Sequence, residues 1–246
     1  MKNSGFPVEK SLALLIDPDK APDSSLENLL SLAEENQIDY IFTGGSITFN
    51  GIDQLIFRIK NRTSLPVVLF PGNLLQLSRQ ADRILLLSLI SGRNPELLIG
   101  NHVLAAPFLK DLKEKVTSVG YILINCGGRT SVEYMSQTES IPCDKPEIAV
   151  ATAIAGELLG MQMIYLEGGS GTGKPVPRET ISEVIKNVSI PVAVGGGLRN
   201  AADIRTAFES GASLVILGNS CEENPLLLRE AASIRDSFRK LPESTS

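Results

Sequence analysis

The segment PVAVGGGLRNAADI, residues 191–204, contains a short apolar run, three glycines and the start of a stretch with helical spacing. Continuous apolar character is typical of strands in a parallel sheet, because both faces of such a sheet are covered. Seven further apolar runs end in glycine or polar residues in the same way. The eight predicted strands are residues 11–17, 40–45, 66–72, 81–90, 120–125, 162–167, 191–197 and 213–219.

Stretches with helical spacing fit between most of these strands. They are residues 24–36, 51–61, 95–115, 145–160, 178–187 and 200–211, with a last one at 225–239. The third connection, residues 73–80, is short and poor in apolar residues, so a regular helix is not expected there. Eight strands alternating with helices predict an α/β fold, a (β/α)₈ TIM barrel. An open doubly wound sheet is the competing fold, but it needs fewer strands.

The length of 246 residues suits one barrel domain spanning residues 1–246, with 240–246 as a frayed tail. No apolar run reaches the ~18 residues needed to span a bilayer. The N-terminus lacks the apolar region of a secretory signal, so a cytoplasmic location is expected. A net charge of −5 argues against nucleic-acid binding, which needs a basic face.

Cysteine and histidine usage limits the available chemistry. The three cysteines, Cys126, Cys143 and Cys221, are widely spaced and form no CxxC pair, so neither a disulfide framework nor a zinc site is indicated. His102 is the only histidine and has no nucleophile motif nearby, which favours a structural hydrogen bond over a catalytic role.

The segment YLEGGSGTGKPVP, residues 165–177, superficially resembles a nucleotide-binding P-loop. Pro175 occupies the place of the Ser or Thr that would ligate magnesium, and prolines here would break the helix that receives the phosphates. The P-loop interpretation therefore fails. In a barrel, however, the loops after the last strands commonly bind phosphate through backbone N–H groups. Three glycine-rich loops, at 168–173, 195–197 and 218–219, predict a phosphate-bearing substrate.

Polar residues at the ends of the first two predicted strands suit a magnesium ion. Asp17 and Asp19 follow one strand, and Ser46 and Thr48 follow the next. Magnesium takes one or two carboxylates together with waters and substrate phosphates, so a sparse site of this kind fits a metal-bound diphosphate. The alternative is that Asp17 and Asp19 simply begin a turn.

Glu167 ends the sixth predicted strand, directly before the glycine-rich loop. A carboxylate there could take a proton from a substrate hydroxyl. Tyr165, two residues earlier, shares its side of the strand and either hydrogen-bonds the substrate or packs in the barrel wall.

Taken together and in order, the motifs resemble one family. The segments LLIDPDK, FTGGSIT, YLEGGSGTGKPVP, PVAVGGGLRN and VILGNS are similar to those of the geranylgeranylglyceryl phosphate synthase family, which includes archaeal enzymes and bacterial PcrB-like proteins. The form GGSGTGKPVP is more like the second group of that family, which has archaeal and bacterial members. One departure is Leu15, where some members carry lysine.

The resemblance implies a Mg²⁺-dependent prenyltransferase that joins a prenyl diphosphate to the C3 hydroxyl of sn-glycerol 1-phosphate through an ether bond. It implies that Asp17 and Ser46 hold Mg²⁺ and that Glu167, with Tyr165, acts in catalysis. The glycerol-phosphate site would comprise Tyr165, Leu166, Glu167, Gly168, Gly169, Ser170, Gly171, Gly196, Gly197, Gly218 and Asn219.

The resemblance also favours a twenty-carbon geranylgeranyl donor over a longer chain, and a homo-oligomer whose order is open. The apolar stretch 148–161 suits either core or a subunit interface. Leu97, Ile99, Val103 and Leu104 are candidates to line a prenyl groove, or are ordinary core. No stable membrane insertion is expected, although transient contact for a lipid product is compatible. Alternative functions are a phosphosugar or indole-glycerol-phosphate-like enzyme and a non-catalytic phosphate-binding barrel.

Overall fold

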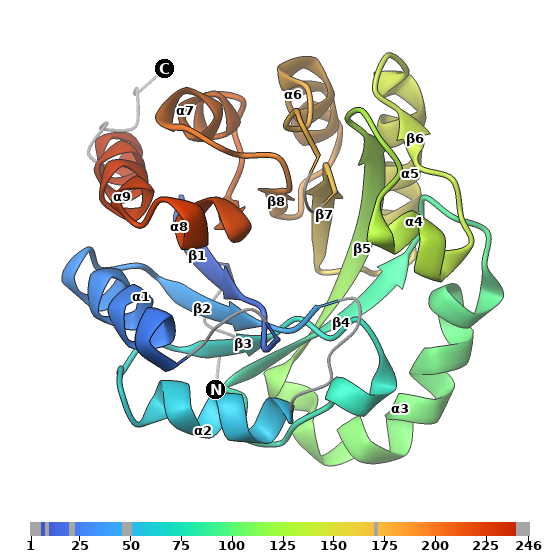
Figure 1. Ribbon diagram of the computed structural model, residues 1–246. Helices are drawn as coiled ribbons and strands as arrows, with labels where there is room; N and C mark the ends of the chain where they lie inside the picture. The colour runs from blue at the N-terminus through green and yellow to red at the C-terminus, as the bar shows by residue number, and fades with distance from the viewer. Residues whose placement is uncertain (1–5, 8–9, 20–22, 46–50, 170–171, 240–246) are drawn as a thin grey trace.

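A computed structural model describes residues 6–7, 10–19, 23–45, 51–169 and 172–239. In it, eight parallel strands form a closed ring with the helices outside (Figure 1). The ring runs β1-β2-β3-β4-β5-β7-β8-β9 and closes where β9 pairs with β1. The predicted TIM barrel is therefore confirmed.

All eight predicted strands are present, seven of them shorter than their apolar runs, whereas β5 begins four residues before the predicted start at residue 120. Their bounds are β1 Ser11–Ile16, β2 Tyr40–Thr43, β3 Val67–Leu69, β4 Arg83–Leu89, β5 Val116–Asn125, β7 Met163–Glu167, β8 Val192–Gly195 and β9 Leu214–Leu217. A short additional strand, β6 Ile141–Pro142, pairs with β5 outside the ring.

Two cores explain the continuous apolar character of the strands. Ala13 of β1 packs inside the barrel with Phe42 and Tyr165, whereas Leu12 and Leu14 pack outward against the helices. Side chains alternate between the two faces of a strand, so each strand needs apolar residues at every position to fill both cores.

Helices cover the outside of the ring (Figure 1). The α-helices are α1 Asp23–Glu35, α2 Ile52–Lys60, α3 Asn101–Leu109, α4 Ser131–Ser136, α5 Pro146–Leu158, α6 Arg178–Asn187, α7 Ala201–Glu209, α8 Asn219–Glu223 and α9 Leu226–Arg239. The third connection holds only a 3₁₀ turn, η1 Leu74–Gln76, as the sequence predicts.

The fourth connection is not the single helix that was expected over residues 95–115. It consists of a π-helical turn, η2 Glu96–Gly100, then α3, then a 3₁₀ segment, η3 Lys110–Lys115. Pro107 lies inside α3, where its ring nitrogen has no proton to donate to the preceding turn. The change of helix type rotates the faces that a single regular helix would present.

None of the helices that the structure describes has both the length and the apolar character to cross a membrane. The tail at 240–246 that the sequence predicts to be frayed lies outside the described residues.

Candidate active site

A polar cavity of about 130 Å³ lies at the carboxyl ends of β7, β8 and β9. It brings together six of the residues predicted for the glycerol-phosphate site: Tyr165, Glu167, Gly196, Gly197, Gly218 and Asn219. We call this cavity the polar pocket. Its remaining lining residues are Leu15, Thr172, Leu198, Arg199, Ile216, Ser220 and Glu223. The three glycine-rich loops thus converge as expected, although Ser170 and Gly171 lie outside the described residues.

Leu166 differs from its two neighbours on β7. Its side chain is fully buried in the outer core between strands and helices, whereas Tyr165 and Glu167 line the polar pocket. The period of two along a strand places it on the opposite face. Its side chain therefore does not line the pocket.

Glu167 is a buried carboxylate with defined hydrogen bonds. Its side chain is 8% exposed, Oε1 accepts a 2.6 Å hydrogen bond from the Gly169 amide, and Oε2 accepts one from the Tyr165 hydroxyl. Burial raises the pKa of Glu167, and these two donors oppose the rise only in part. A carboxyl with a raised pKa is a stronger base once ionised, which suits proton abstraction.

Tyr165 packs in the barrel wall and at the same time orients Glu167. Its ring is 1% exposed and lies edge-on to Phe70 and Tyr121, with centroids 5.5 and 5.3 Å away. Burial, followed by the nearby charge of Glu167, raises the pKa of the phenol well above its usual value, so it stays protonated and donates to the carboxylate. The two residues share a face of β7, as predicted.

Glycines let two loops of the polar pocket interlock. Gly196 has φ +76°, and a methyl group there would lie 2.1 Å from Oε1 of Glu167 and 2.6 Å from the Gly169 nitrogen. A methyl group on Gly197 would lie 2.3 Å from the Lys174 carbonyl oxygen. Only glycine fits such a close approach of backbone to backbone at positive φ.

Thr172 and Arg199 connect the same two loops and were not singled out in the sequence. The Thr172 hydroxyl donates to the Gly169 carbonyl at 2.8 Å, and Nη2 of Arg199 donates to the Thr172 carbonyl at 3.0 Å. The position of Arg199, two residues after a triple glycine, is a signal that could have marked it.

Asp17 lies at the end of β1, on the same rim of the barrel. Its Oδ1 accepts a 3.0 Å hydrogen bond from the Asp19 amide, which agrees with the turn interpretation of this segment. Its carboxylate also lies against Gly45 of the neighbouring loop, since a methyl group there would be 3.8 Å from its atoms. Ser46 and Thr48 lie outside the described residues.

The described residues hold no cluster of three or more metal-ligating side chains. One rim carboxylate fits the donor set of an ion that is completed by waters and substrate phosphates, and does not fit a complete protein cage.

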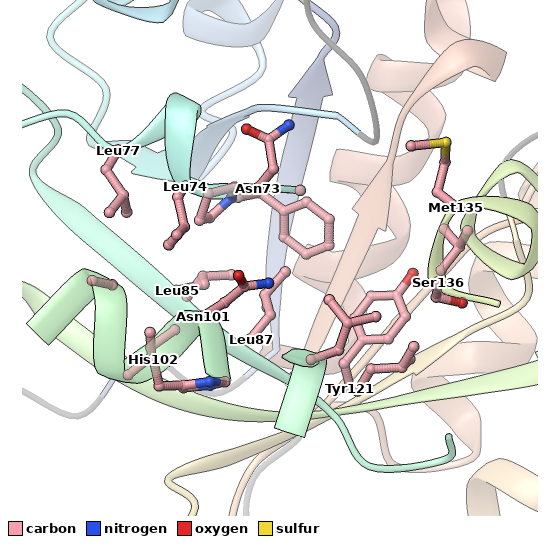
Figure 2. Close-up of a pocket in the computed structure, with 18 of the residues that line it drawn as sticks. Asn73, Leu74, Leu77, Leu85, Leu87, Asn101, His102, Tyr121, Met135 and Ser136 are labelled. Carbon is pink, nitrogen blue, oxygen red and sulfur yellow. The ribbon is translucent and has the colours of Figure 1, made fainter. Parts of the chain in front are cut away.

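An apolar cavity of about 530 Å³ lies beside the polar pocket, and we call it the apolar pocket (Figure 2). Leu85 and Leu87 of β4 and Leu74 of η1 point into it, while Asn101 and His102 of α3 line another side. Val132, Met135 and Ser136 of α4 complete its wall. A cavity of this size and polarity suits a long hydrocarbon.

Of the four candidates for an apolar groove, only Leu97 lines this pocket. Ile99, Val103 and Leu104 are 59–66% exposed on η2 and α3, so their assignment to the groove or the core is wrong. The π-helical turn adds a residue to one turn and moves these side chains outward.

Aromatic rings separate the two pockets. Phe70 and Tyr121 line the apolar pocket, and both contact the ring of Tyr165, which lines the polar pocket. The two pockets therefore adjoin at the Tyr165 ring. A polar group bound at Glu167 and an apolar chain bound over β4 would approach each other there.

His102 and the cysteines have no catalytic arrangement. Nε2 of His102 lies 2.8 Å from Oγ of Ser88, the structural hydrogen bond that the sequence favours, and burial lowers the pKa of the imidazole. Burial also raises the pKa values of the Cys126 and Cys221 thiols to about 12, which makes both unreactive. All three cysteines are free.

Helix α4 and strand β6 were not predicted from sequence, although α4 carries a recognisable start signal. Thr130 caps the helix and Glu133 reaches back to the Thr130 amide at 2.8 Å, forming a capping box. Glu133 also accepts hydrogen bonds from Ser140, and together these donors lower its pKa despite burial. This network holds α4 against the apolar pocket.

Comparison with known proteins identifies the family of this chain. The sequence profile of the PcrB family matches residues 8–236. A geranylgeranylglyceryl phosphate synthase from Chitinophaga pinensis is 46% identical over 224 residues, covering 91% of this chain and 89% of that protein. One from Flavobacterium johnsoniae is 48% identical over 217 residues, covering 88% and 89%.

A crystal structure of (S)-3-O-geranylgeranylglyceryl phosphate synthase from Thermoplasma acidophilum, in complex with sn-glycerol-1-phosphate, superposes with a TM-score of 0.87. It is 29% identical and is covered over 94% of its length by 93% of this chain. Since the family profile and these relatives span nearly the whole molecule, the chain belongs to the PcrB family.

Proposed function

We propose that this enzyme transfers a prenyl group from a prenyl diphosphate to the C3 hydroxyl of sn-glycerol 1-phosphate, with magnesium, to form an ether lipid phosphate. One observation carries the proposal: a small polar pocket with a buried carboxylate adjoins a large apolar pocket where the Tyr165 ring contacts Phe70 and Tyr121. An acceptor phosphate and a long hydrocarbon donor each match one pocket. The sn-glycerol-1-phosphate bound in the Thermoplasma acidophilum structure supports the acceptor, and the name of the relatives, geranylgeranylglyceryl phosphate synthase, supports the class of product.

The acceptor would lie in the polar pocket with its phosphate at the glycine-rich loops. Gly196 and Gly197 bring the backbone close to the cavity, and the loop after β9 supplies Gly218 and Asn219. Backbone N–H groups of such loops bind phosphate without a fixed side chain. The C3 hydroxyl would then point toward Glu167.

Glu167 would take the proton of that hydroxyl. The acceptor oxygen then forms a bond to C1 of the prenyl chain, the bond from C1 to the diphosphate oxygen breaks, and diphosphate leaves. Tyr165 and the Gly169 amide hold the carboxylate in place before and during the transfer. The low exposure of Glu167 keeps competing water away.

Asp17 would hold the magnesium ion, together with Ser46. A bound magnesium ion would neutralise charge on the leaving diphosphate. The position of Asp17 at the rim, against Gly45, supports this assignment, because Gly45 also lines the apolar pocket.

The prenyl chain would occupy the apolar pocket, and we favour the twenty-carbon geranylgeranyl donor. Incubation with labelled sn-glycerol 1-phosphate, Mg²⁺ and prenyl diphosphates of several lengths, followed by chromatography of the extracted lipid, tests the proposal. An ether lipid that is lost with chelator supports it. Absence of product with every donor, despite measured glycerol-phosphate binding, contradicts it and points to a phosphosugar enzyme or a binding protein.

Asp17→Ala separates the metal from the acceptor site. Because loops after β7, β8 and β9 are unchanged, we expect prenyl transfer to fall by about a thousandfold while the Kd for sn-glycerol 1-phosphate changes less than about threefold. Isothermal titration and product chromatography measure the two quantities. Asp144→Ala, at an exposed acidic position between β6 and α5, is the control. Equal loss of binding and transfer would contradict the assignment.

We also propose that the chain forms a homo-oligomer through its outer helices. On α5, Ala149 and Ala153 are buried, whereas Ile148, Leu158 and Leu159 next to its end are exposed, so an apolar outer face is present. A solution mass equal to a monomer would remove this proposal.

A further inference from the structure

The charge of the polar pocket is unbalanced for a phosphate ligand. Its described lining includes two acidic side chains, Glu167 and Glu223, and one basic side chain, Arg199. Lys174 belongs to the glycine-rich loop after β7 but is not among the residues that line the cavity. A phosphate monoester brings up to two further negative charges, and the Arg199 guanidinium is the one cationic side chain within the described lining.

The backbone of Arg199 is fixed by the cap of α7. Asn200 caps the helix by accepting a 3.0 Å hydrogen bond from the Asp203 amide, and the Arg199 amide donates to the Asp203 carboxylate at 3.0 Å. These two hydrogen bonds restrict the backbone of Arg199 and so fix where its side chain begins.

The guanidinium is fixed as well. Nη2 of Arg199, in the loop after β8, donates to the Thr172 carbonyl, in the loop after β7, at 3.0 Å. Thr172 is 5% exposed and is itself bonded to the Gly169 and Lys174 carbonyls. Arginine presents five N–H donors in a planar fork, a geometry that can hold a carbonyl oxygen and a phosphate oxygen at the same time.

We infer that Arg199 is a phosphate-binding residue of the acceptor site, which braces the loop after β7 and offsets the charge of the bound phosphoryl group. The inference rests on the proposed function for the identity of the acceptor. It adds a side-chain contact to a site that the sequence assigns to backbone groups of glycine-rich loops.

The test compares Arg199→Met and Arg199→Lys with Arg205→Met, an arginine on α7 that does not line the pocket. Titration calorimetry without donor measures the Kd for sn-glycerol 1-phosphate. We expect Arg199→Met to raise it about tenfold, since the contact is charge-assisted but partly solvated, and Arg199→Lys to raise it about threefold. Arg205→Met should leave it unchanged.

Two further readouts separate phosphate binding from a purely structural brace. The inhibition constant of inorganic phosphate should weaken by the same factor as the Kd, because the contact is to the phosphoryl group. Arg199→Met should raise KM for sn-glycerol 1-phosphate by a larger factor than it lowers kcat. An unchanged Kd, or a loss of kcat and thermal stability without selective loss of phosphate affinity, would overturn the inference.

Failure of this inference is distinguishable from failure of the proposed function. If the parent enzyme forms ether lipid but Arg199→Met binds acceptor normally, only the role of Arg199 is wrong. If the parent enzyme forms no lipid yet binds glycerol phosphate in an Arg199-dependent way, the site stands and the proposed reaction is wrong.

Discussion

The two pockets of this barrel are built by different means. The polar pocket, about 130 Å³, is formed by backbone turns that interlock through Gly196 and Gly197 and by one buried carboxylate. The apolar pocket, about 530 Å³, is formed by side chains of β4, η1, α3 and α4. A pocket formed by closely packed backbone turns tolerates few substitutions, whereas a pocket lined by apolar side chains can be altered one residue at a time.

The largest expected effect comes from the carboxylate of the polar pocket. Glu167→Gln keeps the shape of the side chain and removes the base, so kcat should fall by about a hundredfold to ten-thousandfold. Binding of sn-glycerol 1-phosphate, measured by calorimetry, should change little. Glu209→Gln, at the exposed C-terminal end of helix α7, is the control. A variant that retains more than a tenth of the parent kcat would remove Glu167 from its role.

Substitution of a single glycine tests whether the polar pocket depends on its backbone. In Gly196→Ala the added methyl group would overlap Oε1 of Glu167 at positive φ, so acceptor binding should weaken more than tenfold and the unfolding free energy should fall by about 1–3 kcal/mol. Gly173→Ala is matched, because its added methyl group meets no atom within 4 Å. Chemical denaturation and calorimetry measure both effects, and similar behaviour of the two variants would contradict the comparison.

A larger side chain in the apolar pocket should affect the donor alone. Leu87→Trp narrows the cavity over β4, so KM for geranylgeranyl diphosphate should rise about tenfold, with a smaller rise for shorter donors. KM for the acceptor should not change. Leu226→Trp, at an exposed position at the start of α9, serves as the control. A rise in acceptor KM equal to that of the donor would show that the pockets are not independent.

The smallest expected effect is on pH dependence. Burial raises the pKa of Glu167 in the folded protein above its unfolded value, so the carboxyl is favoured in its protonated form by folding. The stability from this group is therefore present below the unfolded pKa and lost as pH rises through the folded pKa. Glu167→Gln should remove that loss, and denaturation at a series of pH values measures it. The apparent pKa of the acid limb in the pH profile of kcat/KM should be higher than the ordinary pKa of a glutamate. An apparent pKa at or below the ordinary value would contradict the raised pKa.

Much of the fold could be predicted because the barrel repeats one simple pattern. Each strand is apolar on both faces and ends in glycine or a polar residue, which identified all eight strands and the face shared by Tyr165 and Glu167. Helix α4 is six residues long and β6 is two, too short for hydrophobic periodicity to reveal. The capping box at Thr130 was the available signal.

The apolar pocket could not be placed from sequence because the fourth connection is apolar on all sides. Residues 96–109 give no preferred face, and the π-helical turn shifts the register by one residue, so Ile99 and Val103 point outward. The lining came instead from strand residues such as Leu85 and from η1. Tertiary packing, not local pattern, decides which apolar residues face a cavity.

The interlocked glycine loops have a consequence for changing the enzyme. A methyl group on Gly168 would lie 3.0 Å from the Gly196 carbonyl oxygen, so the two turns are in contact along their main chains. We therefore expect the phosphate-binding loops to tolerate little change. An acceptor for a redesigned enzyme would have to keep its phosphate group, and only the remainder of the acceptor could vary. Variation in donor length can accumulate independently along β4 and α3. The same barrel therefore combines a polar pocket whose backbone restricts substitution with an apolar pocket whose side chains can be exchanged.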